Sequence, residues 1–193
     1  SERFKLTVCN TFAGTVMNTN KEIPYAQYDK HGSAAATQDQ WNWAAEGFKA
    51  LGKLAEELDF RFAFETHMCY IHDLPSATKK LVDMIDNPAV GVNLDYGNAV
   101  YFENIPSLKE TIEEMGESLY YVHLKNSILL SDGSMLKTSL DDGEINHREY
   151  IKLLKDTGYK GPICIEAPRT GDREWYAQQD LKYIKSVIDD ICS

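Results

Sequence analysis

Short apolar runs alternate along the chain with longer stretches in which apolar residues recur at helical spacing. One helical face, for example, carries Phe48, Leu51 and Leu58. This alternation of strands and helices is typical of a parallel sheet built from βα units. The expected strands cover residues 6–12, 60–67, 89–95, 119–125 and 162–167, and the expected helices cover residues 41–58, 74–86, 105–115, 147–157 and 172–191.

One segment interrupts this alternation, because residues 14–40 contain Gly, Asn, Pro, Tyr and Ala without a clear period. We expect a long loop there, and long loops in compact domains are usually functional or disordered. No stretch rich in Pro, Gly or Ser separates two parts of the chain. The pattern therefore predicts one α/β domain over residues 1–193.

The composition excludes several classes of partner. The chain has 30 acidic and 20 basic residues and a net charge of −10, which repels nucleic acids and anionic membrane surfaces. No apolar run approaches the roughly 20 residues that a membrane helix needs, and the first residues lack the pattern of a signal peptide. We therefore expect a cytoplasmic protein with no nucleic-acid or membrane partner. The widely separated cysteines are expected to be free thiols, namely Cys9, Cys69, Cys164 and Cys192.

Candidate chemistry emerges when the strands are divided into their two faces, since successive side chains point to opposite sides of a sheet. In the second expected strand the phenylalanines share one face, whereas Glu65 and His67 lie on the other. The same alternation places Asp95, His123 and Glu166 opposite the apolar faces of the three following strands. These polar residues stand near the C-terminal ends of the strands, where ligands and catalytic groups collect in α/β barrels and open α/β sheets.

Three carboxylates and one imidazole at adjoining strand ends would repel one another unless a cation or shared protons compensated them. A divalent metal ion provides that compensation. Mn²⁺, Mg²⁺ or Co²⁺ suit such ligands best, and Zn²⁺ or Fe²⁺ are compatible. Any one of these residues alone is more often a strand-end group held by hydrogen bonds. The matching positions on four strands favour a metal site made of Glu65, Asp95, His123 and Glu166.

Other residues are candidates for catalysis or substrate binding at the same end of the sheet. His67 is a candidate acid or base, and Lys125 a candidate electrophile or oxyanion partner. The alternatives are a hydrogen-bonded histidine at the rim and a solvated lysine. Arg169 follows the last strand and could bind a substrate hydroxyl, carboxylate or phosphate. A salt bridge from Arg169 to Asp172 or Glu174 is the alternative.

Four segments carry a resemblance to a known family: FAFETH, VNLDYGN, YYVHLKN and DDGEINHREYIKLLKDTGYKGPICIEAP. They resemble the C-terminal five-eighths of the xylose isomerase-like TIM-barrel superfamily, which holds sugar isomerases, ketose 3-epimerases, inosose dehydratases and endonuclease IV. The resemblance covers nearly the whole chain from about Leu6 onward. It implies an incomplete TIM-type (β/α) barrel, with about five of the eight strands present, equivalent to strands 4–8.

The resemblance also implies a set of roles. In ketose 3-epimerases one metal is held by Glu, Asp, His and Glu from four successive strands, and these positions correspond here to Glu65, Asp95, His123 and Glu166. The two glutamates there remove a proton from the carbon beside a carbonyl and return it on the other face. The implied activity is therefore a metal-dependent isomerase or epimerase that acts on a small sugar through an enediolate.

Two departures from the family pattern bear on this activity. Many members have a histidine three residues after the aspartate, whereas Asn98 follows Asp95 here, which argues against endonuclease IV and leaves Asn98 as a substrate-binding candidate. Glu65-Thr66-His67 resembles metal-dependent lyases that cleave 3-keto C-glycosides. One alternative is therefore a lyase or dehydratase that acts on a keto-sugar, an inosose or a 3-keto-C-glycoside. A non-catalytic subunit or fragment is a further alternative.

The number of expected strands has a structural consequence. A complete barrel of this type has about 250 residues and eight strands, and five strands leave two unpaired sheet edges. We therefore expect another chain, a second copy or an upstream segment to complete the barrel.

Overall fold

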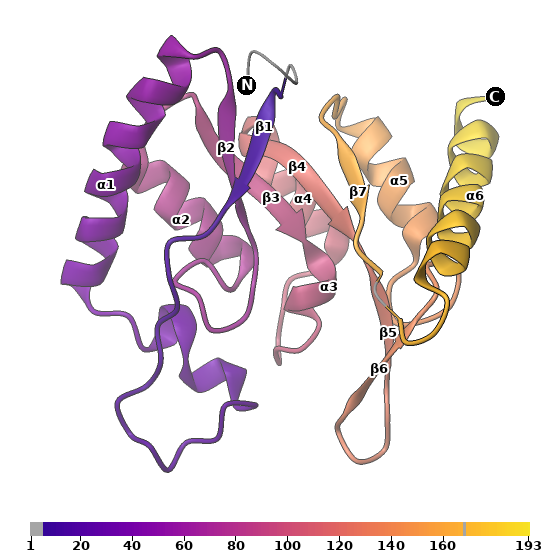
Figure 1. The fold of residues 1–193 in the computed structure, drawn as a ribbon, viewed down its shortest axis with the longest axis horizontal. Coiled ribbons are helices and arrows are strands. Elements are labelled where there is room, and N and C mark those ends of the chain that lie inside the picture. Colours follow the sequence, from indigo (N-terminus) through magenta and orange to yellow (C-terminus); the bar gives the residue numbers. More distant parts are fainter. Residues whose placement is uncertain (1–5, 168) are drawn as a thin grey trace.

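The computed structural model describes residues 6–167 and 169–193. Within these residues, five strands form a parallel sheet in the order β1-β2-β3-β4-β7. The sheet curves into a half-barrel with its helices along the outer face (Figure 1), so the expected incomplete TIM-type barrel is confirmed. Its strands are β1 (Val8–Thr11), β2 (Arg61–Glu65), β3 (Val90–Asp95), β4 (Leu119–Leu124) and β7 (Ile163–Ile165).

The longer helices occupy the stretches where helical periodicity predicts them. Two begin at capping boxes, in which the side chains of Thr37 and Ser107 accept hydrogen bonds from the N–H groups of Gln40 and Glu110. These caps explain why the first helix begins at residue 38 rather than 41 and the third at residue 108 rather than 105. The helices are α1 (Gln38–Glu57), α2 (Pro75–Ile85), α4 (Leu108–Met115), α5 (His147–Asp156) and α6 (Arg173–Cys192).

The hydrophobic core lies between the outer face of the sheet and these helices. Phe64, Val92 and Leu94 of the strands are fully buried there, together with Leu81 of α2 and Met115 of α4. Strand alternation and helical spacing predict these orientations. Burial of each large apolar side chain stabilises the fold by about 1.5–3 kcal/mol. The inner face of the sheet is consequently the one that carries the polar residues.

The connection from β1 to α1 is a long loop, as the lack of hydrophobic periodicity in residues 14–40 predicts, and part of it forms short turns. It contains two 3₁₀ turns, η1 (Tyr28–Lys30) and η2 (Gly32–Ala34). The Val16 N–H group donates to the Cys69 carbonyl oxygen at 2.8 Å. This bond ties the connection to the segment that follows β2.

Several short elements are absent from the sequence prediction. Helix α3 (Tyr96–Ala99) follows β3 directly, and an antiparallel hairpin of β5 (Asn126–Leu129) and β6 (Met135–Thr138) follows β4. A 3₁₀ turn, η3 (Gly116–Ser118), leads into β4. None of these elements exceeds four residues, and none stands out from its neighbours as a regular helical or strand pattern.

The sheet has two edges, β1 and β7, and among residues 6–167 and 169–193 neither edge has a second strand partner. The backbone groups on these edges are available for pairing. That another chain, a second copy or an upstream segment covers them stays a prediction.

Two expectations from composition can be compared with the fold. Cys9, Cys69, Cys164 and Cys192 are free thiols, as predicted. None of the helices in the described part of the chain is both long enough and apolar enough to span a membrane.

Candidate metal centre

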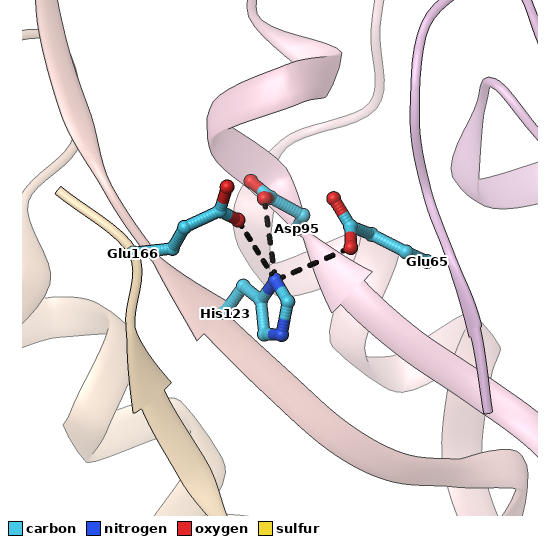
Figure 2. A group of neighbouring side chains, drawn as sticks. All are labelled: Glu65, Asp95, His123 and Glu166. Carbon is cyan, nitrogen blue, oxygen red and sulfur yellow. Dashed lines mark hydrogen bonds and ion pairs between the residues drawn. The ribbon is translucent and has the colours of Figure 1, made fainter. Parts of the chain in front are cut away.

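Four side chains from neighbouring strands converge at the C-terminal end of the sheet (Figure 2). Glu65 and Asp95 are the last residues of β2 and β3, His123 is next to last in β4, and Glu166 follows β7. One potential ligand atom from each residue lies within 4.8 Å of the others. Strand pairing fixes this arrangement: Asp95 lies opposite His123, and the Glu166 N–H group donates to the Leu124 carbonyl oxygen at 2.8 Å.

The Nδ1 atom of His123 is at the centre of the cluster. It lies 3.0 Å from Glu166 Oε2, 3.5 Å from Glu65 Oε2 and 3.7 Å from Asp95 Oδ2. Glu65, Asp95 and His123 are buried, whereas the Glu166 side chain is 41% exposed. Glu166 is therefore the member of the cluster that a molecule from solution can reach.

The charges in the cluster shift the pKa values of its members. Burial raises the pKa of Glu65, and the negative charges of Asp95 and Glu166 act in the same direction. Burial alone would lower the pKa of His123, but interactions with the Asp95 and Glu166 carboxylates raise it to about 10. The hydrogen bond with His123, helped by the charge of Lys125, lowers the pKa of Glu166 to about 2. The cluster therefore stabilises positive charge at its centre.

This donor set fits a divalent metal ion. Three carboxylates and one imidazole nitrogen suit Mn²⁺, Mg²⁺, Co²⁺, Fe²⁺ or Zn²⁺. Asp95 Oδ2 is buried and accepts no hydrogen bond of regular geometry, and the Lys125 ammonium group lies 2.7 Å away. A buried carboxylate oxygen requires a positive charge beside it, which Lys125 or a bound metal ion can supply. The residues that could hold the ion are Glu65, Asp95, His123 and Glu166.

The short helix α3 orients Asp95 and brings two more predicted residues to the cluster. Asp95 Oδ1 accepts the Asn98 N–H group at 3.1 Å and caps α3, which leaves Oδ2 directed at the cluster. The Asn98 side chain donates to Glu65 Oε1 at 3.3 Å and accepts from Lys125 Nζ at 3.1 Å. Lys125 and Asn98 are thus in direct contact with the candidate ligands.

His67 has different surroundings from those that strand alternation predicts. The expected strand extends to residue 67, but β2 ends at Glu65. The His67 Nδ1 atom lies 3.0 Å from the Met68 carbonyl oxygen, and its ring makes edge contacts with Phe12 and Tyr70. The extension of the strand to His67 is therefore wrong, because β2 ends at Glu65 and His67 stands at the start of the turn at residues 68–69. A role for His67 as an acid or base stays a prediction.

Arg169 forms an ion pair within the protein. Its Nη2 atom lies 2.5 Å from Asp180 Oδ2, and its guanidinium group stacks on the Tyr176 ring at 4.3 Å from the centroid. A salt bridge was the expected alternative, but its partner is Asp180 and neither Asp172 nor Glu174. Asp172 instead caps α6. Substrate binding by Arg169 stays a prediction.

Sequence reasoning did not select three further residues that support the cluster. Asn10 Nδ2 donates to Glu65 Oε2 at 2.7 Å, and Asn93 Nδ2 lies 3.1 Å from His123 Nε2. His72 Nδ1 donates to the Glu65 carbonyl oxygen at 2.6 Å. Strand alternation could have identified Asn93, which shares the face of Asp95. His72 lies in a loop, where no periodic signal exists.

The family-level comparison agrees with this geometry. The model of the family described as xylose isomerase-like TIM barrel matches residues 4–187. The chain belongs to this family. The resemblance in the sequence segments around the four candidate ligands is therefore confirmed at the level of the family.

Three individual proteins with similarity to this chain show how much of their length it matches. An inosose dehydratase of Clostridium perfringens is 27% identical over 171 residues, which cover 80% of this chain and 57% of that protein. A xylose isomerase-like TIM barrel protein from Mycobacterium smegmatis was solved in complex with magnesium, and its structure has a TM-score of 0.80 with this one at 23% sequence identity. The match covers 100% of this chain and 64% of that protein's chain. L-ribulose 3-epimerase has a TM-score of 0.72 at 13% identity, over 96% and 62% of the two chains. This chain spans less than two thirds of each of these proteins.

Proposed function

We propose that this chain carries the active site of a metal-dependent sugar isomerase or epimerase. The substrate would be a small polyhydroxylated carbonyl compound, and the reaction would begin with removal of a proton next to the carbonyl. The convergence of Glu65, Asp95, His123 and Glu166 within 4.8 Å carries this proposal. The similarity to an inosose dehydratase and to L-ribulose 3-epimerase supports carbohydrate chemistry.

The two glutamates suit proton transfer on opposite sides of one carbon atom. A divalent ion held by the four residues would polarise the carbonyl and stabilise the enediolate oxygen. In the proposed reaction the accessible Glu166 carboxylate takes the proton, the electrons of the C–H bond form the C=C bond, and the carbonyl oxygen gains the negative charge. Glu65, which enters the reaction protonated, then donates its proton to the other face of the carbon. Figure 2 shows the two glutamates on opposite sides of His123.

Neighbouring residues have supporting roles in this proposal. Lys125 Nζ lies 3.4 Å from Glu166 Oε2, where its charge can stabilise a developing oxyanion. Asn98 is proposed to contact the substrate, because it already joins Lys125 to Glu65. His67 is proposed as an auxiliary acid or base. A substrate contact by Arg169 would require its ion pair with Asp180 to open.

A dehydratase or lyase is the second candidate, favoured by the inosose dehydratases among the relatives. The first proton removal is the same in this candidate. The electrons of the enediolate then expel the neighbouring hydroxyl group, which leaves as water after it accepts a proton from an acid of the site. A keto-glycoside would lose its aglycone in the equivalent step.

The proposed proton transfer can be tested by solvent exchange. We would incubate the Mn²⁺-loaded chain in D₂O with L-ribulose or inosose and follow deuterium incorporation next to the carbonyl. Glu166→Gln should abolish the exchange, whereas Glu46→Gln, which changes an exposed glutamate of α1, should leave it unchanged. Exchange by Glu166→Gln at the wild-type rate would remove Glu166 from the base role.

Product analysis separates the two candidate reactions. An isomerase or epimerase gives a product with the mass of the substrate, whereas a dehydratase gives one that is lighter by one water. No exchange and no product with either substrate, from a chain that also binds no divalent ion, would favour a non-catalytic subunit.

A further inference from the structure

Two asparagines connect Glu65 to His123 across the inner face of the sheet. Asn10 Nδ2 donates to Glu65 Oε2 at 2.7 Å, and Asn93 Nδ2 donates to Asn10 Oδ1 at 3.1 Å. The same Asn93 Nδ2 atom lies 3.1 Å from His123 Nε2. Asn93 is fully buried, and its Oδ1 atom has no hydrogen-bond partner. Buried polar atoms are nearly always paired, so this unpaired oxygen indicates a further role for the side chain.

The orientation of the His123 ring determines which of its N–H groups needs a hydrogen-bond acceptor. Nδ1 is the His123 nitrogen that faces all three carboxylates (Figure 2). It lies within 3.7 Å of one oxygen atom of each. A metal ion held by this cluster would therefore be bound through Nδ1. A neutral imidazole that binds metal through one nitrogen carries its proton on the other. The Nε2–H group then requires a hydrogen-bond acceptor, and the carboxamide of Asn93 faces it.

A half-turn of the Asn93 carboxamide supplies that acceptor. The two ends of a carboxamide have nearly the same shape, and their assignment follows from the hydrogen bonds around them. The half-turn directs Oδ1, the atom without a partner, at Nε2–H and removes a contact between two donors. Asn10 lies exposed on the edge strand β1, so its carboxamide can turn together with that of Asn93. Asn10 Nδ2 then donates to Asn93 Oδ1, in place of the hydrogen bond that it donates to Glu65 Oε2 before the turn.

We infer that Asn93 is a positioning residue that fixes the tautomer of His123, because its Oδ1 atom accepts the Nε2 proton and keeps Nδ1 free for a divalent metal ion. The inference rests on the proposed metal centre and adds a residue to it. The sheet holds Asn93 in place, since it pairs with Glu65 on one side and Tyr121 on the other. Its effect on metal affinity is exerted through His123.

Two substitutions of Asn93 separate this role from simple packing. Asn93→Asp keeps an acceptor facing Nε2, whereas Asn93→Leu keeps the shape and removes it. The affinity of the full chain for Mn²⁺ can be measured from the electron paramagnetic resonance signal of the free ion. We expect Asn93→Leu to lower the affinity by about 10- to 100-fold and Asn93→Asp to retain it. A packing role predicts the reverse order, because leucine suits a buried position and aspartate does not.

The tautomer itself can be observed in the Mg²⁺-saturated protein by ¹⁵N nuclear magnetic resonance of the His123 ring. Wild type and Asn93→Asp should carry the proton on Nε2, with slow exchange against water, and Asn93→Leu should exchange it faster. Asn10→Ala is the matched control, because it removes the neighbouring carboxamide and leaves the acceptor of Nε2 in place. Melting of the metal-free proteins checks that each variant folds.

The outcomes separate this inference from the proposed function. Equal Mn²⁺ affinities of wild type and Asn93→Leu would overturn the role of Asn93 and leave the metal centre intact. A wild-type protein that binds no Mn²⁺ would overturn the metal centre and the inference with it. If Asn93→Leu does not fold, the wild-type spectrum still decides, because a proton on Nδ1 in the Mg²⁺-saturated protein would contradict the inference.

Discussion

The pleat of a β-strand fixes the orientation of the side chains within it. Beyond the end of the strand, the orientation of a side chain depends on its local contacts. Glu65, Asp95 and His123 lie within strands, so alternation along the sequence was sufficient to place them on one face. His67 and Arg169 follow strands that end before them, and hydrogen bonds that no pattern shows determine their surroundings. The residue-level prediction is therefore strongest for groups that strand pairing holds.

The ion pair between Arg169 and Asp180 gives a prediction at this scale. Both side chains are largely buried, and Asp180 also accepts the Leu140 N–H group at 3.1 Å. Asp180→Asn would leave the arginine charge buried without its counter-charge. We expect a loss of about 3 kcal/mol in the free energy of unfolding, measured by urea denaturation.

Helix α6 itself offers a control for this substitution. Asp190 forms an ion pair with Arg148 in which both side chains are more than half exposed. Asp190→Asn should cost less than about 1 kcal/mol, since exposed pairs are screened by water. Equal losses in the two variants would show that the buried pair does not hold α6 to the segment after β7.

Among the elements, the regularity of the apolar pattern decides what the sequence could predict. The long helices carry several periods of apolar residues, and the strands of the sheet lie within apolar runs, so all were found with small shifts at their ends. Helix α3 and the β5–β6 hairpin have four-residue elements, which contain about one helical turn or one strand repeat each. The omission of α3 matters for the site, because this helix orients Asp95 and carries Asn98.

The start of α5 makes stability depend on pH. His147 is buried, its Nδ1 atom donates to the Leu140 carbonyl oxygen at 2.9 Å, and its Nε2 atom has no partner. Burial lowers the pKa of His147 from 6.5 to about 4, although hydrogen bonds with Leu140 and Ile145 and the charge of Asp95 act in the opposite direction. The unfolded chain therefore binds more protons than the folded chain between pH 4 and 6.5.

This difference predicts a loss of stability in acid. The contribution of His147 to stability is fully present above pH 6.5 and declines as the pH falls towards 4, by about 3 kcal/mol in total. His147→Gln should therefore show a shallower decline than wild type in denaturant unfolding across this range. Other groups titrate there as well, so the comparison between the two proteins is the relevant quantity. Parallel pH profiles would contradict the assignment of a depressed pKa to His147.

For the whole molecule, the main feature is an open half-barrel with apolar side chains exposed at both ends of its helical layer. Trp43 and Leu54 of α1 are 67% and 46% exposed, and Trp175 and Leu181 of α6 are 56% and 45% exposed. These helices flank the sheet edges β1 and β7 (Figure 1). Large apolar side chains exposed beside free sheet edges are typical of surfaces that another polypeptide covers.

We therefore expect that the isolated 193-residue chain is not a self-sufficient monomer. Another chain, a second copy or an upstream segment should cover the two edges, and without such a segment the chain should associate. Sedimentation equilibrium on protein of verified mass measures this directly. A stable monomer of 21.9 kDa that unfolds cooperatively and retains metal would contradict the expectation.

The function proposed for the whole molecule depends on one divalent ion bound by Glu65, Asp95, His123 and Glu166. The most direct test is a titration of the metal-free chain with Mn²⁺, in parallel for wild type and Asp95→Ala. We predict one ion bound per wild-type chain and an affinity lower by about 100-fold or more in Asp95→Ala, because the substitution removes a charged ligand. A wild-type chain that binds no ion, or an Asp95→Ala variant that binds it as tightly as wild type, would contradict the account.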